Sequence, residues 1–288
     1  MKKILFIINP IRSKKLKKPI EDYLTDSHNF TEKDYDIEYS EYASHSYDIA
    51  SDNINNYDIF IAAGGDGTVN EVSRAIVGTK KILGIVPIGS GNGLAKHLKI
   101  TAKIPECLKL IKAEKTKIID SALINNRHFI NLSGTGFDAY IAHNFSESKS
   151  RGFKKYIIET IKALFKYKSK DYKINVDGAE LNVKALFLSF ANSNQFGNNA
   201  IINPESVIDD GKLELVICKK FPFYAAPFLA WRLFNKTIHR SKYIEIMSFT
   251  ELLLYNKEEL IAHLDGEPVV FTDDIRISIV PDSIHVIV

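Results

Sequence analysis

The first part of the chain alternates short continuous apolar runs with stretches in which apolar residues recur at helical spacing. The apolar runs cover residues 4–8, 57–63 and 82–87, and continuous runs of this length are typical of strands buried on both faces. A further strand-like alternation covers residues 35–42. Helices are predicted between the strands, at residues 16–24, 44–55, 69–77, 91 onward and 103–113. Because strands alternate with helices, the pattern predicts a parallel sheet with helices on both faces.

From about residue 117 the pattern changes, and strand-like segments follow one another up to residue 280. Asn125-Asn126 and Asp177-Gly178 separate pairs of these segments and are predicted to be hairpin turns. Two stretches with helical spacing, 152–170 and 221–236, interrupt the series. The pattern predicts an α/β domain over residues 1–120 and an antiparallel β-sandwich with helical inserts over residues 121–288.

The composition is that of a globular protein, with 45% hydrophobic and 25% charged residues in a chain of 288. A net charge of +3 is too small to indicate a nucleic-acid-binding protein, but it suits a protein with anionic ligands. Cys107 and Cys218 lack the spacing of a metal site, so we expect two buried free thiols in a reducing cytosol. The apolar run 4–8 ends too early for a signal peptide, and no segment approaches the ~18 apolar residues of a membrane span. We therefore expect a cytoplasmic protein.

The loop Gly64-Gly65-Asp66-Gly67-Thr68 lies directly between a predicted buried strand and a predicted helix. Its glycines allow the backbone to approach a ligand closely, and the N-terminus of the following helix offers free N–H groups to a phosphate. Asp66 would repel phosphate unless a cation intervenes, so its presence indicates Mg²⁺. The alternative is a plain turn in which Asp66 is only an N-cap.

A second glycine-rich loop follows the next predicted strand and contains Gly89-Ser90-Gly91-Asn92-Gly93. Loops that follow successive parallel strands lie at the same edge of the sheet, where ligands of such folds bind. Neither loop has the Gly-Lys-Ser/Thr ending of a Walker A motif or the Gly-x-Gly-x-x-Gly dinucleotide fingerprint. The pair therefore indicates a phosphate site of another kind.

With three motifs further along the chain, these loops resemble the diacylglycerol kinase catalytic-domain family, which includes bacterial diacylglycerol kinases and sphingosine kinases. The motifs appear in family order over most of the chain: Gly64 to Val72, Pro87 to Asn92, Gly134-Thr135-Gly136-Phe137-Asp138, Asp209-Asp210-Gly211 and Asp265-Gly266-Glu267. The resemblance implies a nucleotide-binding α/β domain followed by a β-sandwich domain for the lipid substrate.

The resemblance also implies a set of ATP-binding residues. They are Asn9, Pro10, Ser13, Ser44, Gly64, Gly65, Asp66, Gly67, Thr68, Glu71, Gly89, Ser90, Gly91 and Asn92. The family's first loop usually reads Asn-Pro-x-Ser-Gly, whereas this chain has Asn9-Pro10-Ile11-Arg12-Ser13 and lacks the glycine. Arg12 is either a cation for the phosphates or a solvated residue on a turn.

Phosphoryl transfer to a hydroxyl needs a metal to neutralise the phosphates and usually a carboxylate to receive the hydroxyl proton. By resemblance, Glu267 is that carboxylate and Asp66 belongs to the network of Mg²⁺ and ATP. The alternative for Glu267 is an exposed side chain on a hairpin turn. By resemblance again, a structural Mg²⁺ is held by the Asp210 side chain with the backbone oxygens of Val207 and Lys212, whereas the alternative for that segment is a tight turn.

Two segments are candidates for contact with lipid. Residues 151–170 combine apolar residues at helical spacing with many lysines, as in helices that lie on anionic membranes, or they form a helix packed on the sandwich. Residues 221–234 are rich in aromatic residues and either line an acyl-chain pocket or belong to the core. The eight histidines have no metal-ligand spacing and are predicted to be ordinary surface or core residues.

Together these features predict a lipid kinase that uses ATP and Mg²⁺ to phosphorylate a lipid hydroxyl. Many bacterial diacylglycerol kinases have Asn-Asp at the end of the second loop, whereas Asn92 is followed here by Gly93, as in sphingosine kinases. The acceptor is thus a diacylglycerol, a sphingoid long-chain base or a related lipid. We expect the chain to meet this lipid at the membrane surface, peripheral to the inner face, without a nucleic-acid partner; a homodimer is compatible with the sequence.

Two other functions remain as alternatives. An NAD kinase-like enzyme shares a Gly-Gly-Asp-Gly loop on a related fold, but the Gly-Ser-Gly-Asn loop and the Asp-Gly-Glu turn argue against it. A nucleotide-binding regulator without catalysis would be favoured by the loss of the carboxylates, and Asp66 and Glu267 are both present.

Overall fold

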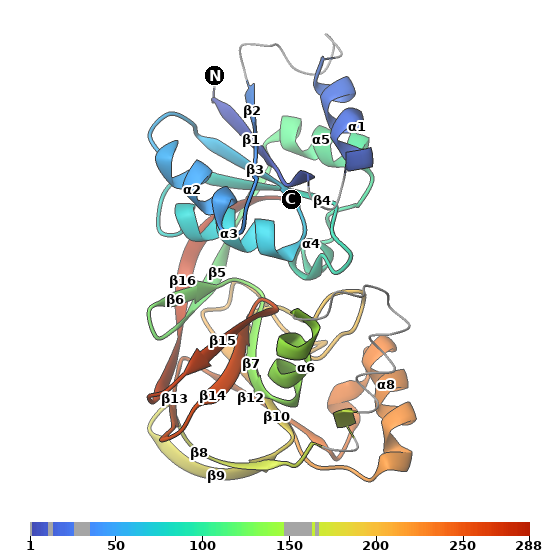
Figure 1. Ribbon diagram of the computed structural model, residues 1–288, viewed down its shortest axis with the longest axis vertical. Coiled ribbons are helices and arrows are strands. Elements are labelled where there is room, and N and C mark those ends of the chain that lie inside the picture. The colour runs from blue at the N-terminus through green and yellow to red at the C-terminus, as the bar shows by residue number, and fades with distance from the viewer. Residues whose placement is uncertain (1, 11–13, 26–34, 147–162, 165–166) are drawn as a thin grey trace. The chain divides into compact units, whose positions relative to one another are not determined.

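The computed structural model describes residues 2–10, 14–25, 35–146, 163–164 and 167–288. The chain divides into two compact units, the first formed by residues 1–121 with 281–288 and the second by residues 122–280. The elements of both units are labelled in Figure 1.

The first unit is built on a parallel sheet. Its strands are β1 (Ile4–Ile8), β2 (Tyr35–Tyr39), β3 (Ile59–Gly64) and β4 (Ile82–Pro87), in the order β2-β1-β3-β4. Every residue of β1, β3 and β4 is buried, as the continuous apolar runs predict. The predicted parallel sheet is therefore confirmed.

Helices connect these strands. They are α1 (Lys14–Thr25), α2 (His45–Asp52), α3 (Asp66–Ile76), α4 (Gly93–His97) and α5 (Ile104–Ala113). The α2 and α3 helices pack on each other, while α1 packs on α5 (Figure 1). All five helices begin close to the positions predicted from the spacing of apolar residues.

The final strand, β16 (Ile275–Ile287), belongs to both units. Its first part pairs with β13 (Glu251–Tyr255) in antiparallel fashion, and its last part pairs with β4 in parallel, with His285 opposite Ile82. The sequence predicts a strand that ends at residue 280, within a domain of residues 121–288. The structure instead groups residues 281–288 with the first unit, because Ile284 and Val286 are buried there.

The second unit is an antiparallel sandwich. One sheet has the order β12-β11-β10-β7-β14-β15 and consists of β7 (Leu132–Gly136), β10 (Phe187–Ala191), β11 (Leu213–Cys218), β12 (Ile244–Phe249), β14 (Leu260–Leu264) and β15 (Glu267–Phe271). In the other, β16 and β13 continue into β8 (Lys170–Val176) and β9 (Ala179–Ala185), and β5 (Thr116–Ile124) pairs with β16 and with β6 (Arg127–Phe129). The predicted sandwich is confirmed.

Side chains from both sheets form the core of the sandwich. Leu188 and Leu215 come from the first sheet, Ile174 and Leu252 from the second, and all four are fully buried. The predicted hairpin turns at Asn125 and Asp177 are confirmed, since both residues have positive φ and join paired strands.

Helices cover the outer face of the first sheet. The α6 helix (Phe137–Ser146) buries Phe137 and Ile141 there, and α8 (Ala226–Phe234) buries Leu229, both in one apolar cluster. The α8 helix lies in the predicted insert 221–236, between the short helices η2 (Phe223–Ala225) and η3 (Ile238–Arg240), whereas α6 was not predicted. The other predicted insert, 152–170, lies largely outside the described residues. Cys107 and Cys218 are buried free thiols, as expected.

The buried part of β16 yields a prediction about stability. Changing Ile284 to Ala should lower the free energy of unfolding by about 2–5 kcal/mol, because it leaves a cavity where the side chain is 1% exposed. The matched control is Arg276→Ala on the same strand, where the side chain is 66% exposed and should matter by less than about 1 kcal/mol. Urea denaturation measures both. Equal effects of the two changes would contradict the assignment of residues 281–288 to the core of the first unit.

Candidate functional site

The two glycine-rich loops lie side by side at the carboxyl ends of adjacent parallel strands. Gly64 is paired with Pro87 in the register of β3 and β4, so the loop before α3 and the loop before α4 leave the same edge of the sheet. In addition, the Ile88 amide donates to the Gly64 carbonyl oxygen at 2.9 Å. The common edge predicted from the sequence is therefore confirmed.

The carboxylate of Asp66 joins these loops. Its Oδ2 accepts a hydrogen bond from the Asn92 amide at 2.8 Å, and its Oδ1 accepts one from the Gly93 amide at 2.6 Å. Burial raises the pKa of Asp66, while these two amides and the charge of Lys96 act in the opposite direction. Asp66 is the first residue of α3 and Gly65 is the N-cap, so Asp66 is not the simple N-cap of the alternative prediction.

The glycines at positions 64 and 89 are needed because neighbouring atoms leave no room for a Cβ atom. A Cβ atom on Gly89 would lie 2.5 Å from the Cα of Gly65 and 2.7 Å from Oδ1 of Asn92. A Cβ atom on Gly64 would lie 2.3 Å from Oγ1 of Thr68. Larger residues at 64 and 89 are thus excluded by contacts within the protein itself.

Asn92 shapes the second loop from within. Its backbone is left-handed, with φ of 51°, and its Nδ2 donates to the Gly89 carbonyl oxygen at 2.7 Å. Within the described part of the chain, its buried Oδ1 has no hydrogen-bond partner. Ser90 is exposed and Gly91 is half-buried. The loop therefore combines a rigid backbone with an accessible hydroxyl and an amide oxygen that can still accept.

The end of β1 contributes to the same edge. Asn9 follows β1, and its Nδ2 donates to Oγ1 of the buried Thr68 at 3.3 Å. Its backbone amide donates to the Ala63 carbonyl oxygen at 3.0 Å. Pro10 comes next and is half-buried, while Ser13 lies outside the described residues. Three successive strand ends of the sheet thus meet near the start of α3.

Glu71 repeats the role of Asp66 one turn further along α3. Its Oε1 accepts from the Ser44 amide at 3.0 Å, and its Oε2 accepts from the Ser46 amide at 3.1 Å. Ser44 occupies the predicted N-cap position of α2 but has a φ of 68° and forms no side-chain cap. The carboxylate of Glu71 satisfies these amides instead, so α3 holds the start of α2 through its own side chain.

The Asp-Gly-Glu motif forms the turn between β14 and β15. Asp265 and Gly266 both have positive φ, and Glu267 is the exposed first residue of β15. The carboxylate of Asp265 accepts three backbone amides, those of Ile130, Asn131 and Leu132, at 2.9–3.0 Å. The turn is therefore fixed to the segment at the start of β7. The carboxylate of Glu267, which is exposed to solvent, projects from this fixed turn.

A buried histidine supports the same turn and was not predicted to have any role. Nε2 of His263 lies 3.3 Å from Oδ2 of Asp138, and the Gly266 amide donates to Nδ1 of His263 at 3.4 Å. Acceptance at Nδ1 places the ring proton on Nε2, which then donates to Asp138. A Cβ atom on Gly134 would lie 2.4 Å from Asp138 Oδ2, so only glycine leaves room for this pair. In the sequence, only the motif Gly134 to Asp138 pointed to this pair.

The predicted structural metal residues lie before β11. Val207 and Asp210 are exposed, and Oδ1 of Asp210 accepts the Lys212 amide at 3.1 Å, as in a tight turn. A further carboxylate, that of Glu214, lies close by and is 7% exposed. Burial, and then the charge of Asp210, raises the pKa of Glu214 to about 7. Within the described residues, its Oε2 has no hydrogen-bond partner.

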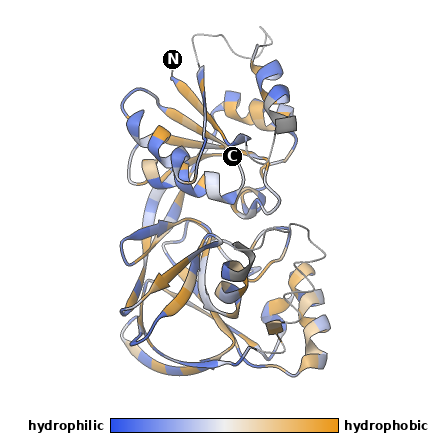
Figure 2. Cartoon of the chain, viewed as in Figure 1, coloured by the Kyte–Doolittle hydropathy of each residue, from blue (hydrophilic) through white to orange (hydrophobic). Residues whose placement is uncertain are grey.

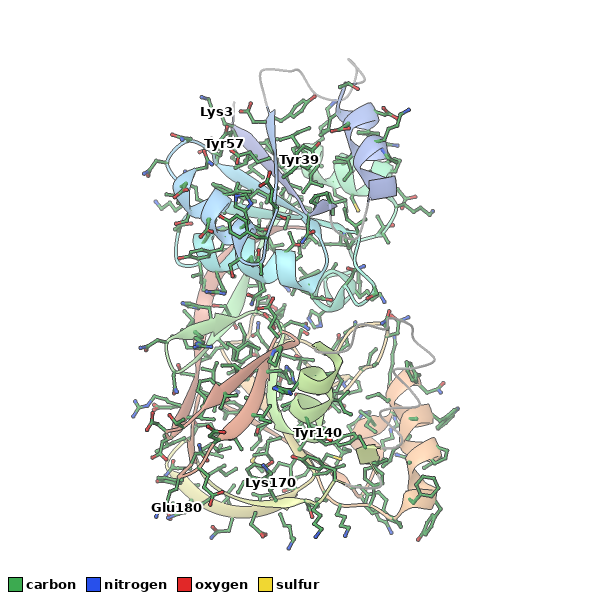
Figure 3. The ribbon with its side chains drawn as sticks, in the orientation of Figure 1. Lys3, Tyr39, Tyr57, Tyr140, Lys170 and Glu180 are labelled. Carbon is green, nitrogen blue, oxygen red and sulfur yellow. The ribbon has the colours of Figure 1, made fainter. Side chains whose placement is uncertain are left out.

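Several labelled side chains lie away from these sites. Figure 3 labels Lys3 and Tyr57, which precede β1 and β3 and lie at the end of the sheet opposite the glycine-rich loops. In the second unit it labels Tyr140 of α6 and Lys170 of β8, which line a hollow on the helical side of the sandwich. This hollow does not include the aromatic stretch 221–234, where the sequence suggested an acyl-chain pocket.

Comparison with protein families gives two matches that together cover most of the chain. Residues 3–124 match the diacylglycerol kinase catalytic domain, and residues 132–288 match the YegS C-terminal NAD kinase beta sandwich-like domain. The second match alone spans more than half of the sequence. The predicted family resemblance is confirmed.

Individual proteins agree with these matches. A "Probable lipid kinase YegS-like" of Yersinia enterocolitica is 28% identical over 78% of this chain and 77% of its own length. A diacylglycerol kinase of Staphylococcus aureus is 33% identical over 57% of this chain and 54% of its own length. The crystal structure of a diacylglycerol kinase from Bacillus anthracis has the same fold, with a TM-score of 0.75, 20% identity, and coverage of 99% of this chain and 96% of that one.

The order of the motifs, the two glycine-rich loops on a parallel sheet and both domain matches thus agree. This chain belongs to the lipid kinase family in which a diacylglycerol kinase catalytic domain is joined to a YegS C-terminal NAD kinase beta sandwich-like domain.

Proposed function

We propose that this chain is an ATP-dependent lipid kinase that transfers the γ-phosphoryl group of ATP to the hydroxyl group of a lipid. The observation that carries the proposal is the edge of the first unit at which Asp66 joins the two glycine-rich loops. Family membership supports a kinase. The names of the relatives, diacylglycerol kinase and lipid kinase, favour diacylglycerol as the first acceptor to test, with sphingoid bases as the second.

The residues at this edge fit a nucleotide phosphate chain. The first turn of α3 presents backbone amides without a side-chain cap in the described structure, and a helix N-terminus of this kind favours an anion. Asn9, Thr68 and Ser90 would add side-chain hydrogen-bond donors. Ser44, Glu71 and the loop 89–92 would complete the site, as the sequence predicts.

Asp66 has two functions in this proposal. It positions the second loop through its bonds to Asn92 and Gly93, and it contributes to a site for Mg²⁺. The carboxylate accepts backbone amides and still has lone pairs to offer, which is compatible with a hard cation or its water. Bound Mg²⁺ would neutralise negative charge on the phosphates.

Glu267 is the proposed base. It is an exposed carboxylate on a turn that Asp265 and His263 hold in place, so it can receive a proton without a large rearrangement of its backbone. In the proposed step, the lipid oxygen forms a bond to the γ-phosphorus, the bond between that phosphorus and the β–γ bridging oxygen breaks, and the lipid hydroxyl proton moves to Glu267. ADP leaves with the bridging oxygen.

We also propose that Val207, Asp210 and Lys212 hold a structural Mg²⁺, with Glu214 close by. A buried oxygen of Glu214 has no hydrogen-bond partner in the described structure, and the charge of Asp210 lies close to it. A nearby cation would compensate both. Two carboxylates and backbone oxygens are ligands of the kind that Mg²⁺ prefers.

The first test concerns Glu267. We expect Glu267→Gln to fold normally, to retain ATP affinity and to lose about 100- to 10,000-fold in turnover, because it removes only the proton acceptor. Transfer of ³²P from ATP to diacylglycerol, a sphingoid base and NAD measures the loss and also separates the lipid kinase from an NAD kinase. Glu259→Gln, at another exposed carboxylate of the same unit, is the matched control. Near-normal turnover of Glu267→Gln would remove this residue from the mechanism.

The second test concerns the position of the second loop. Asn in place of Asp66 has one acceptor oxygen, so one backbone amide loses its partner. We expect a loss of about 1–3 kcal/mol in stability, together with weaker ATP binding. Urea denaturation and calorimetric titration with ATP measure the two effects. Asp52→Asn, on the exposed end of α2, should change neither, and a stable Asp66→Asn protein with full ATP affinity would argue against the proposed role.

The third test concerns the structural metal. Without ATP, Mg²⁺ at about 100 times its Kd should stabilise the wild-type protein by about 2.7 kcal/mol. The Asp210→Asn variant should lose most of this gain, as measured by thermal unfolding with and without Mg²⁺. Asp171→Asn, at a distant exposed carboxylate of the same unit, should keep it. An equal gain in all three proteins would place the cation elsewhere.

A further inference from the structure

A surface around α8 concentrates the exposed aromatic residues of the protein. Ten large hydrophobic side chains are exposed among the described residues, and five of them lie within residues 223–234. They are Phe223, Tyr224, Phe228, Trp231 and Phe234, each between 49% and 82% exposed. Figure 2 shows hydrophobic residues along α8. Exposed apolar patches of this kind usually mark an interaction site.

The residues around α8 carry positive charge only. Residues 219–242 contain six basic residues and no Asp or Glu, in a chain that has 35 acidic residues overall. The basic residues are Lys219, Lys220, Arg232, Lys236, Arg240 and Lys242. Lys219 pairs with Glu245, but in the described structure Lys220, Lys236, Arg240 and Lys242 form no ion pair. We call residues 219–242 the aromatic–basic surface.

The aromatic side chains are held on the outer side of α8 by the packing of its inner side. Leu229 is buried and Leu233 packs against the same apolar cluster. On the outer side, the rings of Phe228 and Trp231 stack with centroids 5.7 Å apart, and the guanidinium of Arg232 lies 4.6 Å from the Phe228 ring centroid. The aromatic face is thus ordered without a partner, and binding needs little further ordering of side chains.

We propose that the aromatic–basic surface docks the protein onto an anionic phospholipid bilayer. Aromatic side chains favour the boundary between headgroups and acyl chains, and each nearby Lys or Arg is attracted to anionic headgroups. The α8 helix has nine residues and rises about 13 Å, so it lies on the membrane rather than crossing it. None of the described helices is long and apolar enough to span a bilayer.

Charge distinguishes this partner from a second copy of the chain. A symmetric dimer through this face would place the same surface of both copies face to face. The basic residues of one copy, including Lys220, Lys236, Arg240 and Lys242, would then face the basic residues of the other, with no acidic residue in the segment to offset them. A bilayer with anionic headgroups provides the opposite charge.

The single tryptophan makes the proposal directly measurable, since Trp231 lies in the surface. We expect its fluorescence to shift to shorter wavelength when the full chain is mixed with vesicles of phosphatidylcholine and phosphatidylglycerol. Phosphatidylcholine vesicles alone should give a smaller shift, and added salt should weaken binding because it screens the charges. The measurement needs neither ATP nor turnover, so its failure and that of the proposed kinase activity are distinguishable.

Two surface variants test the two components separately by co-sedimentation with the mixed vesicles. Replacing Lys220, Lys236, Arg240 and Lys242 by Glu should weaken binding by at least about a hundredfold. Replacing Tyr224 and Phe228 by Ser should weaken it by at least about tenfold. The matched control changes four exposed lysines elsewhere to Glu, at positions 80, 109, 115 and 257, and should bind nearly as well as the wild type.

Three results would overturn the proposal. They are no binding of the wild type to mixed vesicles, binding that survives both surface variants, and a fluorescence shift without vesicles that accompanies dimer formation in sedimentation velocity. All variants should unfold cooperatively in urea as the wild type does, which establishes that they are folded without relying on kinase activity.

Discussion

The carboxylate of Asp66 accepts the backbone amides of Asn92 and Gly93 at the start of α4, and the geometry of the proposed nucleotide site depends on this contact. A loop of five residues with three glycines has many conformations in isolation, and fixing one of them costs conformational entropy. Two charge-assisted hydrogen bonds from one largely buried side chain offset that cost. The backbone contact of Gly65 with Gly89 requires glycine at position 89, where a Cβ atom would lie 2.5 Å from the Cα of Gly65.

The same physical arrangement recurs at the other sites of the protein. Glu71 accepts the amides at the start of α2, and Asp265 accepts three amides of the segment before β7. In each case a carboxylate fixes a loop that belongs to a neighbouring element. Loops held in this way require little reorganisation when a substrate binds, which is the property that phosphoryl transfer by positioning and charge neutralisation needs. Membership of a lipid kinase family explains why these loops would be held in place.

The sequence predicted most of the architecture. Buried parallel strands have continuous apolar runs, so β1, β3 and β4 were visible without any tertiary information. The hairpin turns at Asn125 and Asp177 could be predicted because left-handed turns favour Asn, Asp and Gly. The end of β16 could not be predicted from the sequence, because Pro281 interrupts the apolar pattern. In addition, its partner strand β4 lies about two hundred residues earlier in the chain. Pairing over that separation leaves no local signal.

For the candidate site, the sequence determined which chemical groups are available and their order: two glycine-rich loops, the carboxylates of Asp66 and Glu267, and an aromatic segment with basic residues only. The tertiary structure decided what these groups contact. Asp66 and Glu71 accept hydrogen bonds from backbone amides. His263 pairs with Asp138, and the pair fits only because residue 134 is a glycine. Five aromatic side chains remain exposed instead of joining the core. The physical reason is distance along the chain. A residue's type follows from its own position, whereas its partners come from segments that only folding brings within hydrogen-bonding or van der Waals range.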